Sequence, residues 1–210
     1  HRSDMSKESE KLSPNEAAIL ELAATLGILR PRDLRARGHS VAYLQRLLAK
    51  GRLAKLGRGQ YALPDREPTE DDTLAVTAKR YPGTVVCLLS ALRFHQLTTQ
   101  SPRSIWLAVE GSKLAPSDTP AAVQIVRMTG PSFTSGITTH PVGQVPVRIY
   151  DPAKTVADCF KFRSRIGLDV AVEALRDCLA QRRATPAQIW SFAGICRVKT
   201  IMRPYLEALV

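Results

Sequence analysis

Helix start and stop signals divide the first third of the chain into short, well-marked elements. The sequence predicts three helices, over residues 14–26, 31–36 and 41–50. The start signals are Ser13, Pro14, Glu16, Pro31 and Ser40, and the glycines that follow are Gly27, Gly38 and Gly51. Two short apolar runs, residues 52–56 and 60–63, then flank Gly57-Arg58-Gly59, which is typical of a tight β-hairpin. Three helices followed by a hairpin predict a winged helix-turn-helix domain.

Positive charge is concentrated in this same segment. Between Arg30 and Arg58 the chain has nine basic residues and one acid. Duplex DNA presents a dense line of phosphates, and a helix flanked by cations is the usual element that enters its major groove. The segment therefore predicts binding of double-stranded DNA.

The outer face of the third predicted helix supplies candidate base contacts. Arg46 has the donors for guanine N7 and O6, and Gln45 has the amide that pairs with adenine. Ser40, at the helix start, suits a phosphate. Arg58, at the hairpin tip, is placed to enter a minor groove or to meet a phosphate. The complete set of predicted DNA contacts is Arg32, Arg35, Arg37, Ser40, Tyr43, Gln45, Arg46, Lys50, Lys55 and Arg58.

Charge and proline content place a domain boundary after the hairpin. The net charge is +6 over residues 5–66 and +1 over residues 67–150, and it rises to +4 in the rest of the chain. Residues 64–72 are acidic and carry two prolines, as linkers often do. Residues 1–4 precede a methionine and are interpreted as an expression remnant. We expect a DNA-binding domain over residues 5–66 and a second domain over residues 67–210.

The second domain changes its hydrophobic period along the chain. Four short β-branched runs predict strands over residues 104–109, 123–128, 136–140 and 145–150. Helical patterns lie before and after them, over residues 73–81, 90–97, 151–162, 169–181, 185–193 and 198–209. The pattern predicts an α+β domain of helices around a small, mainly antiparallel sheet.

Composition limits the class of protein. The longest apolar run, residues 85–89, is far too short to cross a bilayer, and no signal peptide is evident, so we expect a cytoplasmic protein without a membrane partner. The four cysteines lack the spacing of a metal site and lie in apolar surroundings, which predicts buried free thiols. No metal or cofactor is expected. The four cysteines are Cys87, Cys159, Cys178 and Cys196.

The sequence of the second domain gives little evidence of an enzymatic site. Asp151, Lys154 and Asp158 could suggest a metal-dependent nuclease, but Asp151 fits a helix N-cap and the other two are spaced as an ion pair on one helix. His95 and His140 are separated by the predicted sheet and lack a base-and-orienter arrangement. We expect no catalytic residues.

Several phrases resemble the AbiEi family, the antitoxins of type IV (abortive-infection) toxin–antitoxin systems. The phrase at residues 147–160, with Lys154, Thr155 and Asp158, is the most specific, and the resemblance runs from Leu12 to Leu209. The other phrases are residues 57–61, 89–98, 102–109 and 167–175.

The resemblance implies two activities for a chain of this kind. The winged helix would bind inverted repeats in its own promoter and repress it. The second, antitoxin domain would counteract a nucleotidyltransferase-like toxin and need not form a stable complex with it. A basic surface in the antitoxin domain is expected at Lys154, Lys161, Arg163 and Arg165. The alternative is a winged-helix regulator whose second domain senses a small ligand, which requires a cavity with convergent polar groups.

Overall fold

The protein is described by a computed structural model that covers residues 12–66, 71–111 and 122–209. The interpreted expression remnant at residues 1–4 and the middle of the predicted linker lie outside the described residues. The chain divides into two compact units, with the division between residues 69 and 70. Each unit is described by itself.

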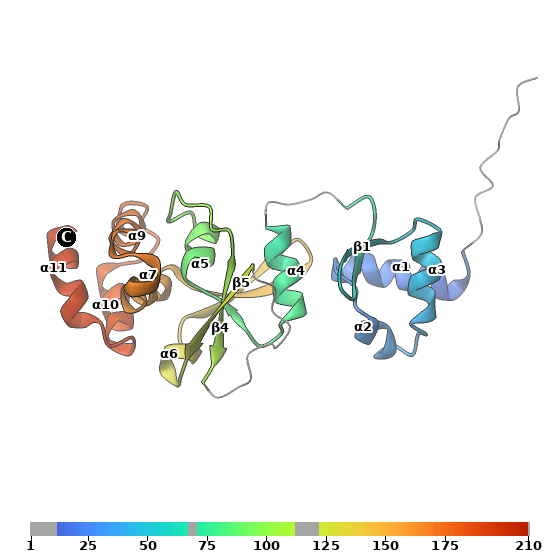
Figure 1. Cartoon of the computed structure of the whole chain (residues 1–210), viewed down its shortest axis with the longest axis horizontal. Helices are drawn as coiled ribbons and strands as arrows, with labels where there is room; N and C mark the ends of the chain where they lie inside the picture. Colours follow the sequence, from blue (N-terminus) through green and yellow to red (C-terminus); the bar gives the residue numbers. More distant parts are fainter. Residues whose placement is uncertain (1–11, 67–70, 112–121, 210) are drawn as a thin grey trace, which may run out of the picture. The chain divides into compact units, whose positions relative to one another are not determined.

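The N-terminal unit contains three helices and a hairpin, in the predicted order (Figure 1). These elements are α1 (Pro14–Leu26), α2 (Pro31–Arg35), α3 (Ala42–Ala49), β1 (Ala54–Gly57) and β2 (Gln60–Ala62). The two strands pair antiparallel, and Leu29 adds an antiparallel bridge to Tyr61 of β2. The arrangement is that of a winged helix-turn-helix-like unit.

Local capping explains where these helices begin. Ser13 and Glu16 form the predicted capping box of α1, in which each side chain accepts a hydrogen bond from the other residue's backbone N–H. The start of α3 differs slightly from the prediction. Its N-cap is Val41, and Ser40, one residue before the N-cap, accepts a 3.3 Å hydrogen bond from the Ala42 N–H with its hydroxyl. Ser40 therefore tightens the turn that leads into the helix.

A small hydrophobic core holds the three helices and the hairpin together. Ile19 of α1, Leu34 of α2, and Leu44 and Leu47 of α3 are almost completely buried, and Tyr61 of β2 closes the cluster. Burial of each large aliphatic side chain contributes about 1.5–3 kcal/mol. Because this core fixes one face of α3, the opposite face is turned to solvent.

The second unit contains a five-stranded sheet and the remaining helices. Its strands are β3 (Val85–Val86), β4 (Ile105–Glu110), β5 (Val123–Met128), β6 (Ile137–Val142) and β7 (Val145–Tyr150). Its helices are α4 (Asp72–Arg80), α5 (Leu88–Phe94), α6 (Pro131–Thr134), α7 (Pro152–Lys161), α8 (Arg163–Ile166), α9 (Leu168–Ala180), α10 (Pro186–Ile195) and α11 (Lys199–Leu209). The four predicted strands and the six predicted helices are all present, and the class is α+β as expected.

The sheet is mixed, which corrects the prediction of a mainly antiparallel one. The strand order is β5-β4-β3-β7-β6. The β3 strand pairs antiparallel with β4 but parallel with β7, and β4 pairs parallel with β5 over their whole length. Residues 111–122 connect β4 to β5 and are numerous enough for a parallel return. The prediction failed because β4 and β5, although both predicted, pair in parallel, and because it missed β3, the short central strand that pairs in parallel with β7.

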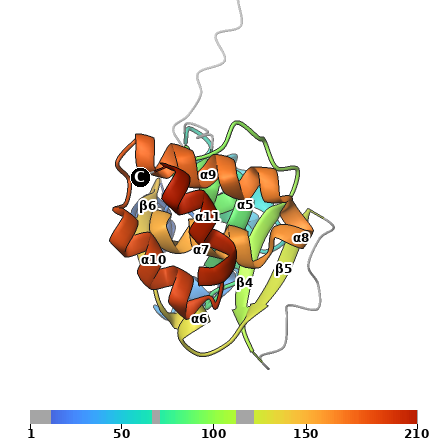
Figure 2. The same ribbon diagram turned by 90° about the vertical axis from the view of Figure 1, so that its left-hand side faces the viewer.

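Helices cover both faces of this sheet. Figure 1 shows α7, α9, α10 and α11 gathered on one side of the sheet and α4 on the other. In Figure 2 these C-terminal helices lie in front of β4 and β5. The main core of the unit forms between this helical layer and the sheet, with Leu92, Ala108, Val156 and Phe160 among its fully buried members. Helix α7 lies at the centre of this packing and contacts α5, α9 and α10.

Candidate nucleic-acid interface

Helix α3 presents a polar face to solvent. Leu44 and Leu47 point into the core, so Gln45 and Arg46, which lie between them on the helix, are exposed. These two residues were predicted to contact bases. A solvent-facing helix with an amide and a guanidinium at adjacent positions provides donors and an acceptor that match the edges of bases in a major groove.

Tyr43 connects this face to α1. Its hydroxyl accepts a 3.2 Å hydrogen bond from Asn15 Nδ2, and its ring lies 5.4 Å from the guanidinium carbon of Arg46. The cation–π contact restricts the Arg46 side chain before any ligand arrives. Asn15 was not predicted as part of the interface, because a contact over 28 positions leaves no local signal in the sequence.

Lys50, another predicted contact, is engaged within the protein. Its Nζ lies 2.9 Å from Oε1 of Glu16, whose side chain is buried. Hydrogen bonds from the Ser13 backbone and from Lys50 lower the pKa of Glu16 to about 2. The carboxylate therefore stays ionised and neutralises Lys50, which positions α3 against α1 rather than offering a free cation.

The turn before α3 carries exposed cations. Arg32, Arg35 and Arg37 are all exposed, as expected for residues that would meet phosphates. Arg32 lies 3.9 Å from Asp33, with more than half of its side chain in solvent. Ser40 is exposed beside them. This group lies next to the start of α3, where a phosphate would approach a recognition helix.

The β1–β2 hairpin carries two further cations. Gly57 pairs with Gln60, so the turn has two residues, Arg58 and Gly59, instead of the predicted three. Gly59 has φ +66°, a value that favours glycine and suits the tight turn. Arg58 and Lys55 are exposed, which places a guanidinium at the tip of the wing.

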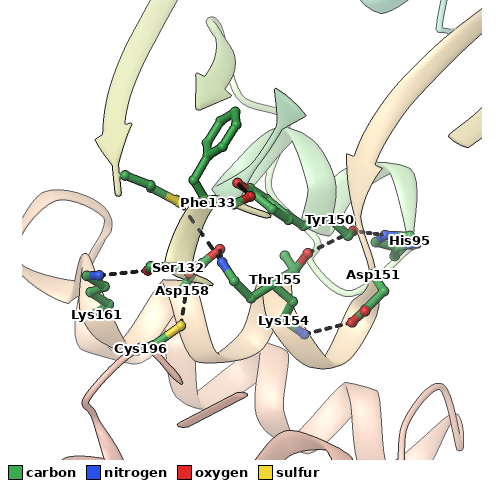
Figure 3. A network of polar contacts seen from close by, with 11 residues as sticks. His95, Ser132, Phe133, Tyr150, Asp151, Lys154, Thr155, Asp158, Lys161 and Cys196 are labelled. Carbon is green, nitrogen blue, oxygen red and sulfur yellow. Dashed lines mark hydrogen bonds and ion pairs between the residues drawn. The ribbon is translucent and has the colours of Figure 1, made fainter. Parts of the chain in front are cut away.

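The second unit contains a buried polar network around α7, shown in Figure 3. Lys154 Nζ lies 2.5 Å from Asp158 Oδ2, and both side chains are fully buried. The Cys196 thiol donates to the other oxygen of Asp158 at 3.2 Å. Lys154 is therefore not part of a basic surface, contrary to the prediction. The reason is that α7 is the central helix of the unit and has no solvent face at this position.

Tyr150 extends this network toward the sheet. Lys154 Nζ lies 4.1 Å from the centre of the Tyr150 ring, and the Tyr150 hydroxyl donates to the Phe133 carbonyl. Burial raises the pKa of both Tyr150 and Asp158, and the Lys154 charge partly offsets the rise for Asp158. Every one of these groups has a partner inside the protein, so the network supports a structural role.

The two histidines lie closer together than the sequence suggested. The rings of His95 and His140 are 5.9 Å apart, and both contact Phe94. His95 Nε2 lies 2.7 Å from the Tyr150 carbonyl oxygen, and burial lowers the pKa of His95. The statement that the sheet separates them is therefore wrong. Their contacts are nevertheless structural, since His95 forms its hydrogen bond with a backbone carbonyl of β7.

The three remaining residues of the predicted basic surface behave differently from one another. Lys161 donates to the Ser132 hydroxyl at 2.8 Å. Arg163 donates to the Phe160 carbonyl three residues earlier. Arg165 is exposed and lies 5.0 Å from the Trp106 ring. These three side chains do not form one continuous basic surface. Lys161 contacts Ser132, whereas Arg165 lies near Trp106.

The other chemical predictions concern metals, thiols and membranes. All four cysteines are free and buried, as predicted, and burial raises the pKa of Cys196 to about 12. Among the residues that the structure describes, no three His, Cys, Asp or Glu side chains are grouped so that they could hold a metal ion. Within the same residues, no helix is both long and apolar enough to span a membrane.

An exposed polar face on α3, cations before it and a cation-tipped wing define a winged-helix regulator type of unit. Residues 17–64 match the family model described as "Transcriptional regulator, AbiEi antitoxin". The matched range includes all of these features; Asn15, Glu16 and the start of α1 lie before it. The N-terminal unit therefore carries an AbiEi-type regulator domain, and the resemblance noted in the sequence is confirmed for residues 17–64.

The whole fold is similar to a solved structure, the RV2827C protein from Mycobacterium tuberculosis. The TM-score is 0.58 at 15% sequence identity, and the match covers 88% of this chain and 72% of that chain. At this identity the likeness shows the fold alone. None of the curated proteins matches the sequence.

Proposed function

We propose that the protein is the antitoxin of a type IV toxin–antitoxin system and represses its own promoter. The observation that carries the proposal is the solvent-facing side of α3, with Gln45 and Arg46 exposed, in a unit of the AbiEi regulator family. In this proposal α3 enters the major groove of an inverted repeat, one copy of the chain on each half-site. The protein acts in the cytoplasm, without catalysis of its own.

The exposed cations around α3 serve as phosphate contacts in this proposal. Neutralisation of about five phosphates predicts a slope of roughly −4.5 for the logarithm of the binding constant against the logarithm of salt concentration. Lys50 is left out of this number because it is paired with Glu16. The phosphate contacts are Arg32, Arg35, Arg37, Lys55 and Arg58.

The first experiment measures binding to a duplex from upstream of the gene, against a scrambled duplex of equal length. We expect selective binding of the upstream duplex, which Arg46→Ala weakens while leaving the weaker binding to the scrambled duplex almost unchanged. Arg93→Ala, an exposed arginine of α5, is the matched control. Equal binding to both duplexes would contradict promoter recognition and leave only an electrostatic attraction to DNA.

The antitoxin half of the proposal is tested separately in cells. The partner expected from the family is a nucleotidyltransferase-like toxin encoded beside this gene. Co-expression of the full chain should restore growth to cells that produce the toxin, and Arg46→Ala should still do so when expressed from an unrelated promoter. Loss of protection in that variant would mean that neutralisation depends on the DNA-binding face.

One observation favours part of the alternative function, a ligand-sensing second domain. The second unit contains a pocket with convergent polar groups, which is the feature that the alternative requires. A ligand site in the second unit is compatible with an AbiEi-type N-terminal unit, so one protein can combine DNA binding with ligand binding.

A further inference from the structure

The second unit has a pocket of about 630 Å³ between the end of α7, the start of α6 and the turn from α10 to α11. The residues Thr129, Ser132, Lys161, Cys196 and Arg197 line it, and Gly194 forms part of its wall. Figure 3 shows Lys161, Ser132 and Cys196 on the same side of the buried Lys154–Asp158 pair, away from His95. None of these residues belongs to the proposed DNA interface.

The pocket is positively charged. Lys161 and Arg197 contribute two cations, and no carboxylate is found among the described residues that line it. The nearest acid behind the wall is Asp158, which the Cys196 thiol contacts from the pocket side. Because Lys154 neutralises Asp158 inside the core, the field in the pocket is set by Lys161 and Arg197.

Lys161 is held in place for a ligand. Its ammonium group donates to Ser132 Oγ at 2.8 Å, and Ser132 itself is buried. An ammonium group has three donors, so the bond to Ser132 leaves others for an anion. Since Ser132 Oγ accepts from Lys161, its own hydroxyl hydrogen remains to donate into the pocket. The pair thus presents donors at a fixed position.

Arg197 lines the pocket at the turn from α10 to α11. It follows α10 with φ +59°, in the left-handed region that favours glycine, and its N–H donates to the Gly194 carbonyl. The backbone conformation fixes the direction in which the guanidinium leaves the chain. A third cation lies near this wall, because a Cβ on Gly194 would be 3.0 Å from Cε of Lys199.

We propose that this pocket binds a small phosphate-bearing ligand. A phosphoryl group between Lys161 and Arg197 would receive charge-assisted hydrogen bonds from both, with Ser132 and Thr129 as hydroxyl partners. Two cations and two hydroxyls suit a dianion with several oxygens better than a single carboxylate. The volume exceeds that of a bare phosphate and lies in the range of small-molecule sites, so the remainder of the ligand occupies the same pocket.

The test is calorimetric titration of the full chain with inorganic phosphate, pyrophosphate and ATP, at constant ionic strength. We expect a Kd of about 1 mM or tighter for at least one of these probes. Lys161→Gln and Arg197→Gly should each raise that Kd at least about tenfold, the loss of one charge-assisted contact. A gain from phosphate to pyrophosphate identifies a polyphosphate ligand, and a further gain with ATP identifies a nucleotide.

A matched control separates the lost guanidinium from the altered backbone. Arg182 follows α9 with φ +54° and lies outside the pocket, so Arg182→Gly relaxes the same kind of backbone geometry without changing the site. It should bind like the wild type. Equal losses in Arg182→Gly and Arg197→Gly, or no binding of any probe at about 10 mM, would overturn the proposal.

This proposal stands apart from DNA recognition. Arg46→Ala should keep full affinity for the phosphate probe even if it loses the promoter, since α3 belongs to the other unit. If Arg46→Ala abolishes binding of the probe while Arg197→Gly retains it, the ions bind at the DNA interface and the pocket is not the site. Thermal melts of each variant confirm that it is folded.

Discussion

Single residues decide how the cations of this protein are used, and Lys50 shows this most clearly. A lysine on the outer side of a recognition helix is an obvious candidate for a phosphate contact. The carboxylate of Glu16, 2.9 Å away, instead neutralises it and connects α3 to α1. The capping box could be read from the sequence because its members are three positions apart, whereas the Glu16–Lys50 pair spans 34 positions and leaves no such signal.

This ion pair gives a prediction for pH dependence. The pKa of Glu16 falls from 4.5 to about 2 in the folded protein, so its ionised form stabilises the fold fully above pH 4.5. That contribution is lost as the pH falls toward 2. We expect Glu16→Gln to lower the melting temperature at pH 7 and to have no effect near pH 2. Glu21→Gln, an exposed acid on the same helix, should show no such convergence.

The buried Lys154–Asp158 pair gives a prediction of larger magnitude. Lys154→Met leaves the Asp158 carboxylate buried without its cation, which should cost about 3–5 kcal/mol in the free energy of unfolding. The double variant Lys154→Met/Asp158→Leu should recover part of this loss because no charge then remains in the core. Urea unfolding measures both. A single variant as stable as the wild type would show that Asp158 is already protonated or solvated.

At the scale of elements, the sequence was informative where local chemistry repeats. The strands β4 to β7 are short, rich in β-branched residues and bounded by turn residues, and helices such as α10 begin with a threonine cap and a proline, so these elements were all predicted. The strand β3 was missed because two valines buried on both faces have no period. The sheet type was also mispredicted, because β4 and β5 pair in parallel and β3 pairs in parallel with β7.

The same limit applies to the candidate sites. The exposed side of α3 follows from helical spacing, and its solvent-facing residues were predicted correctly. The phosphate pocket was not predicted as a site, because its residues come from three separate segments between Thr129 and Arg197. Only the packing of α6, α7 and the α10–α11 turn brings them together, although Lys161 was predicted in a basic surface and Cys196 as a buried thiol.

The β1–β2 wing gives the prediction that belongs to this scale. Arg58 occupies the two-residue turn at the tip of the wing and is exposed, so we expect it to contact phosphate. Arg58→Ala should weaken binding to promoter and scrambled duplexes by the same factor and reduce the salt slope by about 1. A change in sequence preference would instead mean that the wing reads base edges or groove width. Arg93→Ala serves again as the control.

At the scale of the whole molecule, the protein joins two units that each have a hydrophobic core of their own. The core of the N-terminal unit is built around Ile19, Leu44 and Leu47, and that of the second unit around α7 and the sheet. The two proposed activities divide along the same line, with the DNA interface on one unit and the phosphate pocket on the other. A change in one core should therefore be felt mainly in one activity.

Separate cores also predict how the chain unfolds. Leu44→Ala removes a fully buried side chain from the N-terminal unit and should cost it about 2–5 kcal/mol, while Leu92→Ala does the same in the second unit. In scanning calorimetry each variant should shift one thermal transition to lower temperature and leave the other in place. If either substitution moves both transitions together, the units unfold as one cooperative body, and ligand binding in the second unit would then stabilise the DNA-binding unit as well.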